Sequence, residues 1–300
     1  SGCNQAPDLL EHNNPHQYSV ATDVLWASPD GLDLTMDTYT PLSGKASYPV
    51  LLIFHGGAWL INDKSIMTQT AQYFATNSEY VVCNVNYRLL GDQANSITLD
   101  QIVEDALGAV LWVKYNINRY RGDSQKLAIT GDSAGAHLAA MVVNKGKDLD
   151  SRGYSQRNLA LTPTYLPQGK YAEDIKEAGG IEVQAALLSY GVFDLYQRGQ
   201  ENFESWKNPF WYFAGVLPRG LFGEGKSAIT HPDLYKGISP IHTIPGSDNR
   251  SLPPQLLTVG SADTLTTPAE VKNYLRQLRA NGHRAKYWEY ADKKHAYLDS

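Results

Sequence analysis

Continuous apolar runs recur along the chain and predict strands that are buried on both faces. A short apolar run between polar segments is typical of a parallel sheet that helices cover on both sides. Such runs, together with the strand-like final segment, occupy residues 50–54, 80–87, 126–130, 185–190, 255–260 and 285–290.

The N-terminal part of the chain has a different pattern, because apolar and polar residues alternate there. An apolar segment at 24–26 precedes a Pro-Asp-Gly turn at 29–31, and apolar residues then alternate with polar ones over 32–37. Alternation with a period of two predicts a β-hairpin that has one solvent-facing side.

Helical patterns lie between the apolar runs. The last of them has Thr267 as a candidate cap and Pro268 in its first turn. Strands that alternate with helices predict a doubly wound, mostly parallel α/β sheet, whose ligands bind at the carboxyl ends of the strands. The helical patterns cover about 66–77, 97–120, 135–145 and 268–281.

The pattern predicts one main domain over residues 20–300, preceded by an N-terminal tether at 1–19. Residues 191–250 form an irregular insertion that is rich in Gly and Pro. A long insertion of this kind is typical of a functional loop or of a cover over a site. Packing of the insertion onto the body is the alternative for each of its clustered aromatics, which are Phe203, Trp206, Phe210, Trp211, Tyr212 and Phe213.

Composition narrows the possible partners. The chain has 300 residues, of which 42% are hydrophobic and 19% charged, so a sizeable core is expected. The net charge of -5 and the scattered Lys and Arg residues argue against nucleic acid as a partner. No apolar run approaches the roughly 20 residues that span a bilayer.

The two cysteines have different surroundings and show no metal-ligand spacing, so no metal site is predicted. Cys83 lies in an apolar run and is expected to be a small buried hydrophobe. The start Ser1-Gly2-Cys3 is similar to the end of a bacterial lipoprotein signal, which implies membrane anchoring through a lipidated Cys3. A cell-envelope or secreted location would follow. A cloning remnant before an ordinary cysteine is the alternative, and it leaves the cytoplasm open.

A G-x-S-x-G pentapeptide surrounds Ser133 within KLAITGDSAGAHL. Alone it is a weak signal in a chain with 25 glycines, but here a predicted strand ends before the serine and a helix begins after it. Small residues on both sides let neighbouring backbone approach, while the serine is held exposed in a strained turn. Ser133 is therefore the predicted nucleophile, and the N–H of Ala134 is placed to stabilise an oxyanion.

A second motif, His55-Gly-Gly-Ala-Trp59, directly follows the apolar run at 50–54. Glycines in such a loop let main-chain N–H groups point into a pocket without obstruction by side chains, as an oxyanion hole requires.

These motifs, with VNYRL at 85–89 between them, resemble the α/β-hydrolase superfamily, in its hormone-sensitive-lipase-like and carbohydrate-esterase (acetyl xylan or feruloyl esterase-like) branches. The resemblance implies an α/β-hydrolase fold and oxyanion donors on the backbone of Gly57, Ala58 and Ala134. It implies no metal and no organic cofactor. His55 is expected to be structural, because the family order is serine, acid, histidine.

That order points to Asp263, in the loop after the run at 255–260, as the acid, with Asp194 as its rival. His295, after the run at 285–290, is the expected base, and His283 is expected at the surface. Family members usually continue with a helix after the base. Only residues 296–300 follow here, so the His295 loop is expected to be weakly braced.

The predicted activity is hydrolysis of carboxylic esters through an acyl-enzyme. Trp59 and Trp211 are the candidate substrate-binding residues, and core packing is the alternative for each. The substrate is expected to be a small ester or an acylated saccharide carrying acetyl or feruloyl groups. A general short-chain carboxylesterase and a non-catalytic binding protein on the same fold remain the alternatives.

Overall fold

The computed structural model describes residues 15–152 and 159–299. Cys3 and most of the predicted tether lie outside the described residues. The part of the chain that is described contains no helix with both the length and the apolar character needed to cross a bilayer.

A single eight-stranded sheet forms the centre of the molecule, in the order β1-β2-β4-β3-β5-β6-β7-β8. The two pairings that involve β2 are antiparallel and the other five are parallel, so the predicted hairpin and the mostly parallel sheet are both present. The strands are β1 (Tyr18–Ala27), β2 (Leu34–Pro41), β3 (Tyr48–Phe54), β4 (Val81–Val85), β5 (Gly122–Asp132), β6 (Ala185–Ser189), β7 (Gln255–Gly260) and β8 (Ala285–Tyr290).

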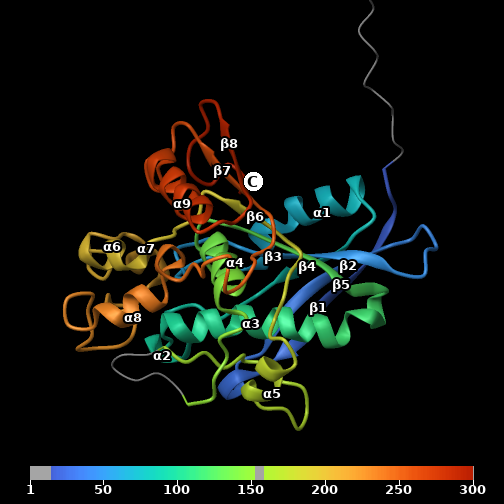
Figure 1. The fold of residues 1–300 in the computed structure, drawn as a ribbon, viewed down its shortest axis with the longest axis horizontal. Helices are drawn as coiled ribbons and strands as arrows, with labels where there is room; N and C mark the ends of the chain where they lie inside the picture. The colour runs from blue at the N-terminus through green and yellow to red at the C-terminus, as the bar shows by residue number, and fades with distance from the viewer. Residues whose placement is uncertain (1–14, 153–158, 300) are drawn as a thin grey trace, which may run out of the picture.

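Helices lie on both sides of this sheet (Figure 1). The larger core cluster joins α3 and α4 to the central strands, and α1 packs on the opposite face through Ala71 and Ala75 against Ile53 and Val82. The α-helices are α1 (Thr68–Asn77), α2 (Asp92–Asn95), α3 (Leu99–Asn116), α4 (Ala134–Lys145), α5 (Ala172–Glu177), α6 (Leu195–Gln200), α7 (Phe210–Ala214), α8 (Pro232–Gly237) and α9 (Pro268–Ala280).

The four longer helices occur where the sequence predicts them. Helix α9 begins as expected, with Thr267 accepting a hydrogen bond from the Glu270 N–H and Pro268 in the first turn. The insertion contributes the short helices α6, α7 and α8, which lie together to one side of α4 in Figure 1. Helices of five or six residues show too little periodicity to be predicted from the sequence.

The topology brings the candidate chemistry to one edge of the sheet. The loop after β3 carries the His-Gly-Gly motif, and Ser133 directly follows β5. Asp263 and His295 come after β7 and β8. Since these strands are parallel, their carboxyl ends meet at the same edge.

Candidate active site

The turn between β5 and α4 holds Ser133 in a strained conformation, with φ 53° and ψ -116°. Its flanking glycines allow two close backbone approaches. A Cβ on Gly131 would lie 2.3 Å from the carbonyl carbon of Gly135, and a Cβ on Gly135 would lie 1.9 Å from the Phe54 oxygen. The motif is therefore a packing requirement of the turn.

Replacing Gly135 by alanine is expected to destabilise the fold by about 3 kcal/mol, because β3 or α4 must move to admit the methyl group. Urea unfolding measures this as a lower midpoint. Gly237→Ala is the matched control, since its nearest contact would be a Leu159 side-chain atom at 3.2 Å. Similar losses of stability in the two variants would contradict this account of the motif.

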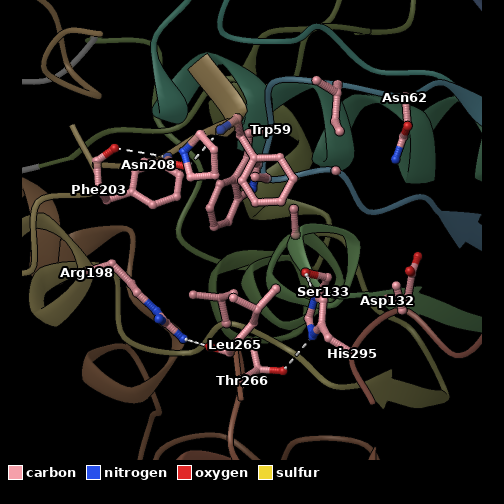
Figure 2. Close-up of a pocket in the computed structure, with 18 of the residues that line it drawn as sticks. Trp59, Asn62, Asp132, Ser133, Arg198, Phe203, Asn208, Leu265, Thr266 and His295 are labelled. Carbon is pink, nitrogen blue, oxygen red and sulfur yellow. Dashed lines mark hydrogen bonds between the residues drawn. The ribbon is translucent and has the colours of Figure 1, made fainter. Parts of the chain in front are cut away.

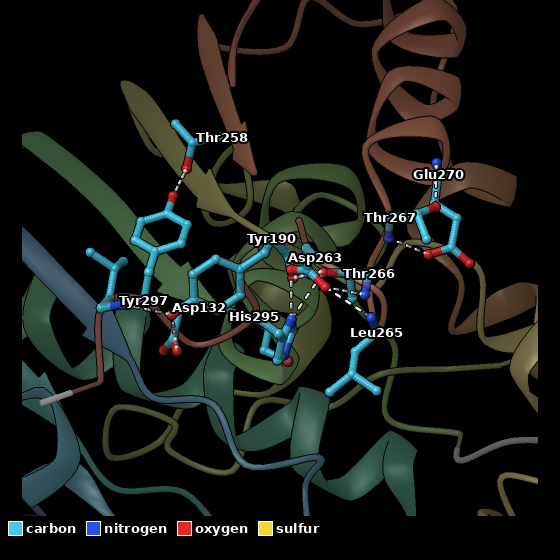
Figure 3. A network of polar contacts seen from close by, with 12 residues as sticks. Asp132, Tyr190, Thr258, Asp263, Leu265, Thr266, Thr267, Glu270, His295 and Tyr297 are labelled. Atoms are coloured by element: carbon cyan, nitrogen blue, oxygen red, sulfur yellow. Dashed lines mark hydrogen bonds and ion pairs between the residues drawn. The ribbon is translucent and has the colours of Figure 1, made fainter. Parts of the chain in front are cut away.

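Ser133, His295 and Asp263 form a continuous hydrogen-bonded chain. The Ser133 Oγ lies 2.9 Å from His295 Nε2, and His295 Nδ1 lies 2.8 Å from Asp263 Oδ2. Figure 2 shows His295 beside Ser133, and Figure 3 shows its other side facing Asp263. The structure thus brings together the three residues that the sequence proposes as nucleophile, base and acid.

Asp263 is suited to remain a carboxylate. Burial acts to raise its pKa, but the hydrogen bond with His295 and the N–H groups of Thr266 and Leu265, at 2.8 and 2.9 Å, hold the pKa below its usual range. An ionised carboxylate at Nδ1 favours the tautomer that carries the proton there, which leaves Nε2 free to accept one from Ser133.

The rival acid has a different role. The Oδ1 atom of Asp194 caps α6 by accepting from the Gln197 N–H at 2.9 Å, and the same oxygen lies 3.6 Å from His242. The expectation of a surface His283 is wrong: its ring is buried, and Nε2 contacts the Pro245 oxygen at 2.5 Å. This ring joins the turn between α9 and β8 to the segment before β7.

The loop that bears His295 is better braced than the sequence suggests. The Lys293 oxygen accepts from the Ala262 N–H at 2.9 Å, and the Asp292 N–H donates to Ser261 Oγ at 2.8 Å. A Cβ on Gly260 would lie 2.1 Å from the same Lys293 oxygen. The acid loop and the base loop therefore support one another directly.

The candidate oxyanion loop is also strained. Gly57, Ala58 and Trp59 have φ values of 127°, 55° and 57°. A Cβ on Gly57 would lie 2.2 Å from the Ile61 oxygen, so only glycine fits there. Gly57, Ala58 and Ala134 all line the cavity above Ser133.

His55 lies beneath this loop as a structural residue. Its ring stacks on Tyr87 with centroids 4.3 Å apart, and burial lowers its pKa to about 4. The His55 Nδ1 atom lies 2.6 Å from the Gly56 oxygen, whereas the Ser133 Oγ contacts His295, in agreement with the expected order of serine, acid and histidine.

The two candidate tryptophans differ in position. Trp59 is buried but lines the cavity with part of its surface, and its indole N–H donates to His137 Nδ1 at 3.1 Å. Trp211 is fully buried and is absent from the cavity lining; its N–H donates to the Phe203 oxygen at 2.8 Å. Trp211 is therefore not placed to contact a substrate directly. Its indole instead holds the backbone of Phe203, which lines the cavity.

A cavity of about 480 Å³ opens over Ser133 and His295. The insertion supplies much of its wall, as Figure 2 shows for Arg198, Phe203 and Asn208. Arg198 also donates to the Leu265 oxygen, so the insertion is tied to the acid loop. The sequence named Phe203 and Phe210 within the aromatic cluster, and both line the cavity, but it missed wall residues such as Arg198 and Asn208. Within 15–152 and 159–299, His, Cys, Asp and Glu form no group of three that could hold a metal ion.

The fold and this arrangement agree with the comparison to known families, since the BD-FAE family model matches residues 36–278. The chain belongs to the BD-FAE family. Its membership confirms the predicted resemblance to α/β-hydrolase esterases.

Two curated relatives of this BD-FAE chain are an esterase and a carboxylic ester hydrolase by name. It is 27% identical over 287 residues to Esterase LipQ of Mycobacterium tuberculosis, covering 94% of this chain and 59% of the relative. It is 28% identical over 255 residues to the probable carboxylic ester hydrolase LipM of the same organism, covering 85% and 48%. The chain thus spans about half to three-fifths of the length of these relatives.

Solved structures support the fold of this BD-FAE chain. Thermogutta terrifontis esterase 2, phosphorylated by paraoxon, superposes with a TM-score of 0.65 at 20% identity, covering 93% of this chain and 84% of that one. The chain therefore has the α/β-hydrolase fold.

Proposed function

We propose that this chain is a serine carboxylesterase that works through an acyl-enzyme. The observation that carries the proposal is the hydrogen-bonded chain from Ser133 through His295 to Asp263, opening onto a cavity. The esterase names of its relatives support the same reaction class.

In this mechanism Ser133 Oγ attacks the ester carbonyl carbon while His295 Nε2 takes its proton. Asp263 stabilises the imidazolium, which then protonates the leaving alcohol. The N–H groups of the Gly57 loop and of Ala134 bind the oxyanion, each contributing on the order of 3 kcal/mol. Water then attacks the acyl-enzyme by the reverse sequence of proton transfers.

The proposed substrate is an acylated saccharide that carries an acetyl or feruloyl group. Polar side chains at the cavity wall suit a hydroxyl-rich alcohol, and the rings of Phe203 and Phe210 suit an aromatic or sugar face. The apolar side chains of Val192 and Leu265, which also line the cavity, favour a short aliphatic ester as the second candidate.

Hydrolysis of p-nitrophenyl acetate and methyl ferulate tests the proposal, with Ser133→Ala as the control. We expect turnover of at least one ester by the wild type and covalent labelling by an organophosphonate. Turnover of acetate alone would favour acetyl esters. Absence of both hydrolysis and labelling would overturn the proposed enzymatic function and favour a non-catalytic binding protein on this fold.

A further inference from the structure

Two carboxyl groups lie beside the triad and have no part in the mechanism above. Asp132 immediately precedes Ser133 and is 1% exposed, while Asp299 lies in the short segment after His295. Both line the active-site cavity. The two carboxyl groups lie within hydrogen-bonding reach of each other, and such a bond forms when one of them carries a proton.

This Asp132–Asp299 pair lies in a tight polar cluster next to the base. The Tyr190 hydroxyl donates a hydrogen bond to Asp132 Oδ2 at 2.8 Å. The Leu298 N–H donates a hydrogen bond to the same hydroxyl at 3.4 Å. The Tyr190 ring also meets the His295 ring edge to face, with centroids 4.8 Å apart. Figure 3 shows Tyr190 between Asp132 and His295.

Among the described groups that face the Asp132–Asp299 pair, none is a lysine or an arginine. Besides Tyr190 and the Gly56 N–H, the titratable groups that face it are Tyr87, Tyr297 and His295. Apart from the facing carboxyl group, the buried Oδ1 atoms of Asp132 and Asp299 have no hydrogen-bond partner. A second negative charge at this place would therefore be poorly compensated.

Burial accordingly favours the protonated form. Burial and the nearby charge of Asp299 raise the pKa of Asp132 to about 8, and burial also raises the pKa of Asp299. When two carboxyl groups are buried next to each other, one of them keeps its proton at a pH at which an isolated carboxyl group has lost it.

We propose that the hydrogen bond between Asp132 and Asp299 positions the catalytic base, by holding the segment after His295 against the residue before Ser133. The catalytic consequence rests on the proposed esterase function. Asp299 is in this sense a positioning residue: it keeps the Nε2 atom of His295 within reach of Ser133 Oγ.

The pH dependence follows from the direction of the shift. The pKa of Asp132 is raised from 3.8, so the shared proton stabilises the docked segment most at acid pH; this contribution declines with rising pH and is lost above about 8. Other contacts, such as Tyr297 Oη to Thr258 Oγ1 at 2.8 Å, hold the segment at neutral pH. Release is therefore expected only on the alkaline side.

The pH profile of kcat tests the pair. For the wild type we expect kcat to fall about fivefold between about pH 7 and roughly pH 9.5. Asp299→Asn should show no such fall, because its amide donates to the Asp132 carboxylate at every pH. Asp299→Ala should lower kcat more than it changes KM at all pH values, and asparagine should rescue that loss.

Asp292→Asn is the matched control, because it removes an exposed carboxylate from the same loop. It should retain the alkaline fall of the wild type. A fall of equal size in the wild type and Asp299→Asn, or no fall in the wild type, would overturn the positioning role.

Amide hydrogen exchange of Leu298 supplies a readout that needs no turnover. After correction for intrinsic rates, its protection should drop about tenfold above about pH 8 in the wild type and stay constant in Asp299→Asn. If protection responds in this way but no ester is hydrolysed, the esterase function is overturned while the contact between Asp132 and Asp299 is supported. If the protection of Leu298 depends on pH in the same way in both proteins, the proposed contact is overturned, whatever the activity.

Discussion

Replacing Ser133 by alanine is expected to lower kcat by about a millionfold while the protein remains folded. The Oγ atom is the group that would form the acyl bond, and it accounts for the 2.9 Å contact with His295 Nε2. Alanine keeps the Cβ and the strained backbone of the turn, so the fold should change little. Ester hydrolysis under saturating substrate, with far-UV circular dichroism and urea unfolding, measures both effects.

Ser189→Ala is the matched control for this prediction. Ser189 ends the neighbouring strand β6, and its hydroxyl accepts a hydrogen bond from Thr258 Oγ1 at 3.0 Å. Removal of this buried hydroxyl should leave kcat within about tenfold of the wild type and lower stability by about 1 kcal/mol. If Ser133→Ala retained activity at the level of Ser189→Ala, another nucleophile would have to be sought.

Replacing Asp263 by asparagine is expected to lower kcat by about 10⁴-fold with little change in KM. The amide keeps the shape of the carboxylate but presents a neutral group to His295 Nδ1, which favours the wrong tautomer and fails to stabilise the imidazolium. Steady-state kinetics on the ester that the wild type hydrolyses best measures the effect.

Asp194→Asn separates the two acids that the sequence left open. Asp194 caps α6, so its replacement by asparagine should lower the free energy of unfolding by less than about 1 kcal/mol. It should leave kcat within about tenfold of the wild type. A larger loss of kcat in Asp194→Asn than in Asp263→Asn would reverse the assignment.

The lowered pKa of Asp263 also predicts an effect on stability. A carboxylate whose pKa is depressed on folding stabilises the folded state above its unfolded pKa of 3.8, and this contribution is lost as the pH falls through the lower folded value. Loss of this carboxylate should therefore flatten the acid side of the stability curve in Asp263→Asn.

Local patterns carried much of the fold. Apolar runs such as 50–54 and 126–130 became central strands because residues buried on both faces must be apolar along their whole length. The glycines around Ser133 were informative because backbone passes within van der Waals distance of both. Such requirements act on neighbouring residues, so they are visible in one segment at a time.

Contacts between distant segments were beyond the reach of the same patterns. The aromatic cluster marked the insertion, but its periodicity could not show that Phe203 faces the cavity while Trp211 is buried behind it. His283 looked like a turn residue, and only the packing of the turn against Pro245 explains its burial.

By itself, the sequence determined where the candidate groups lie along the chain: a candidate oxyanion loop, the turn at Ser133, then a candidate acid and a candidate base in loops after late strands. The tertiary structure decided which carboxylate meets His295, which aromatic rings form the cavity wall, and that Asp132 lies against Asp299. The physical reason is that turns and strands depend on local backbone geometry, whereas side-chain pairing depends on how the parallel strands bring remote loops to one edge of the sheet.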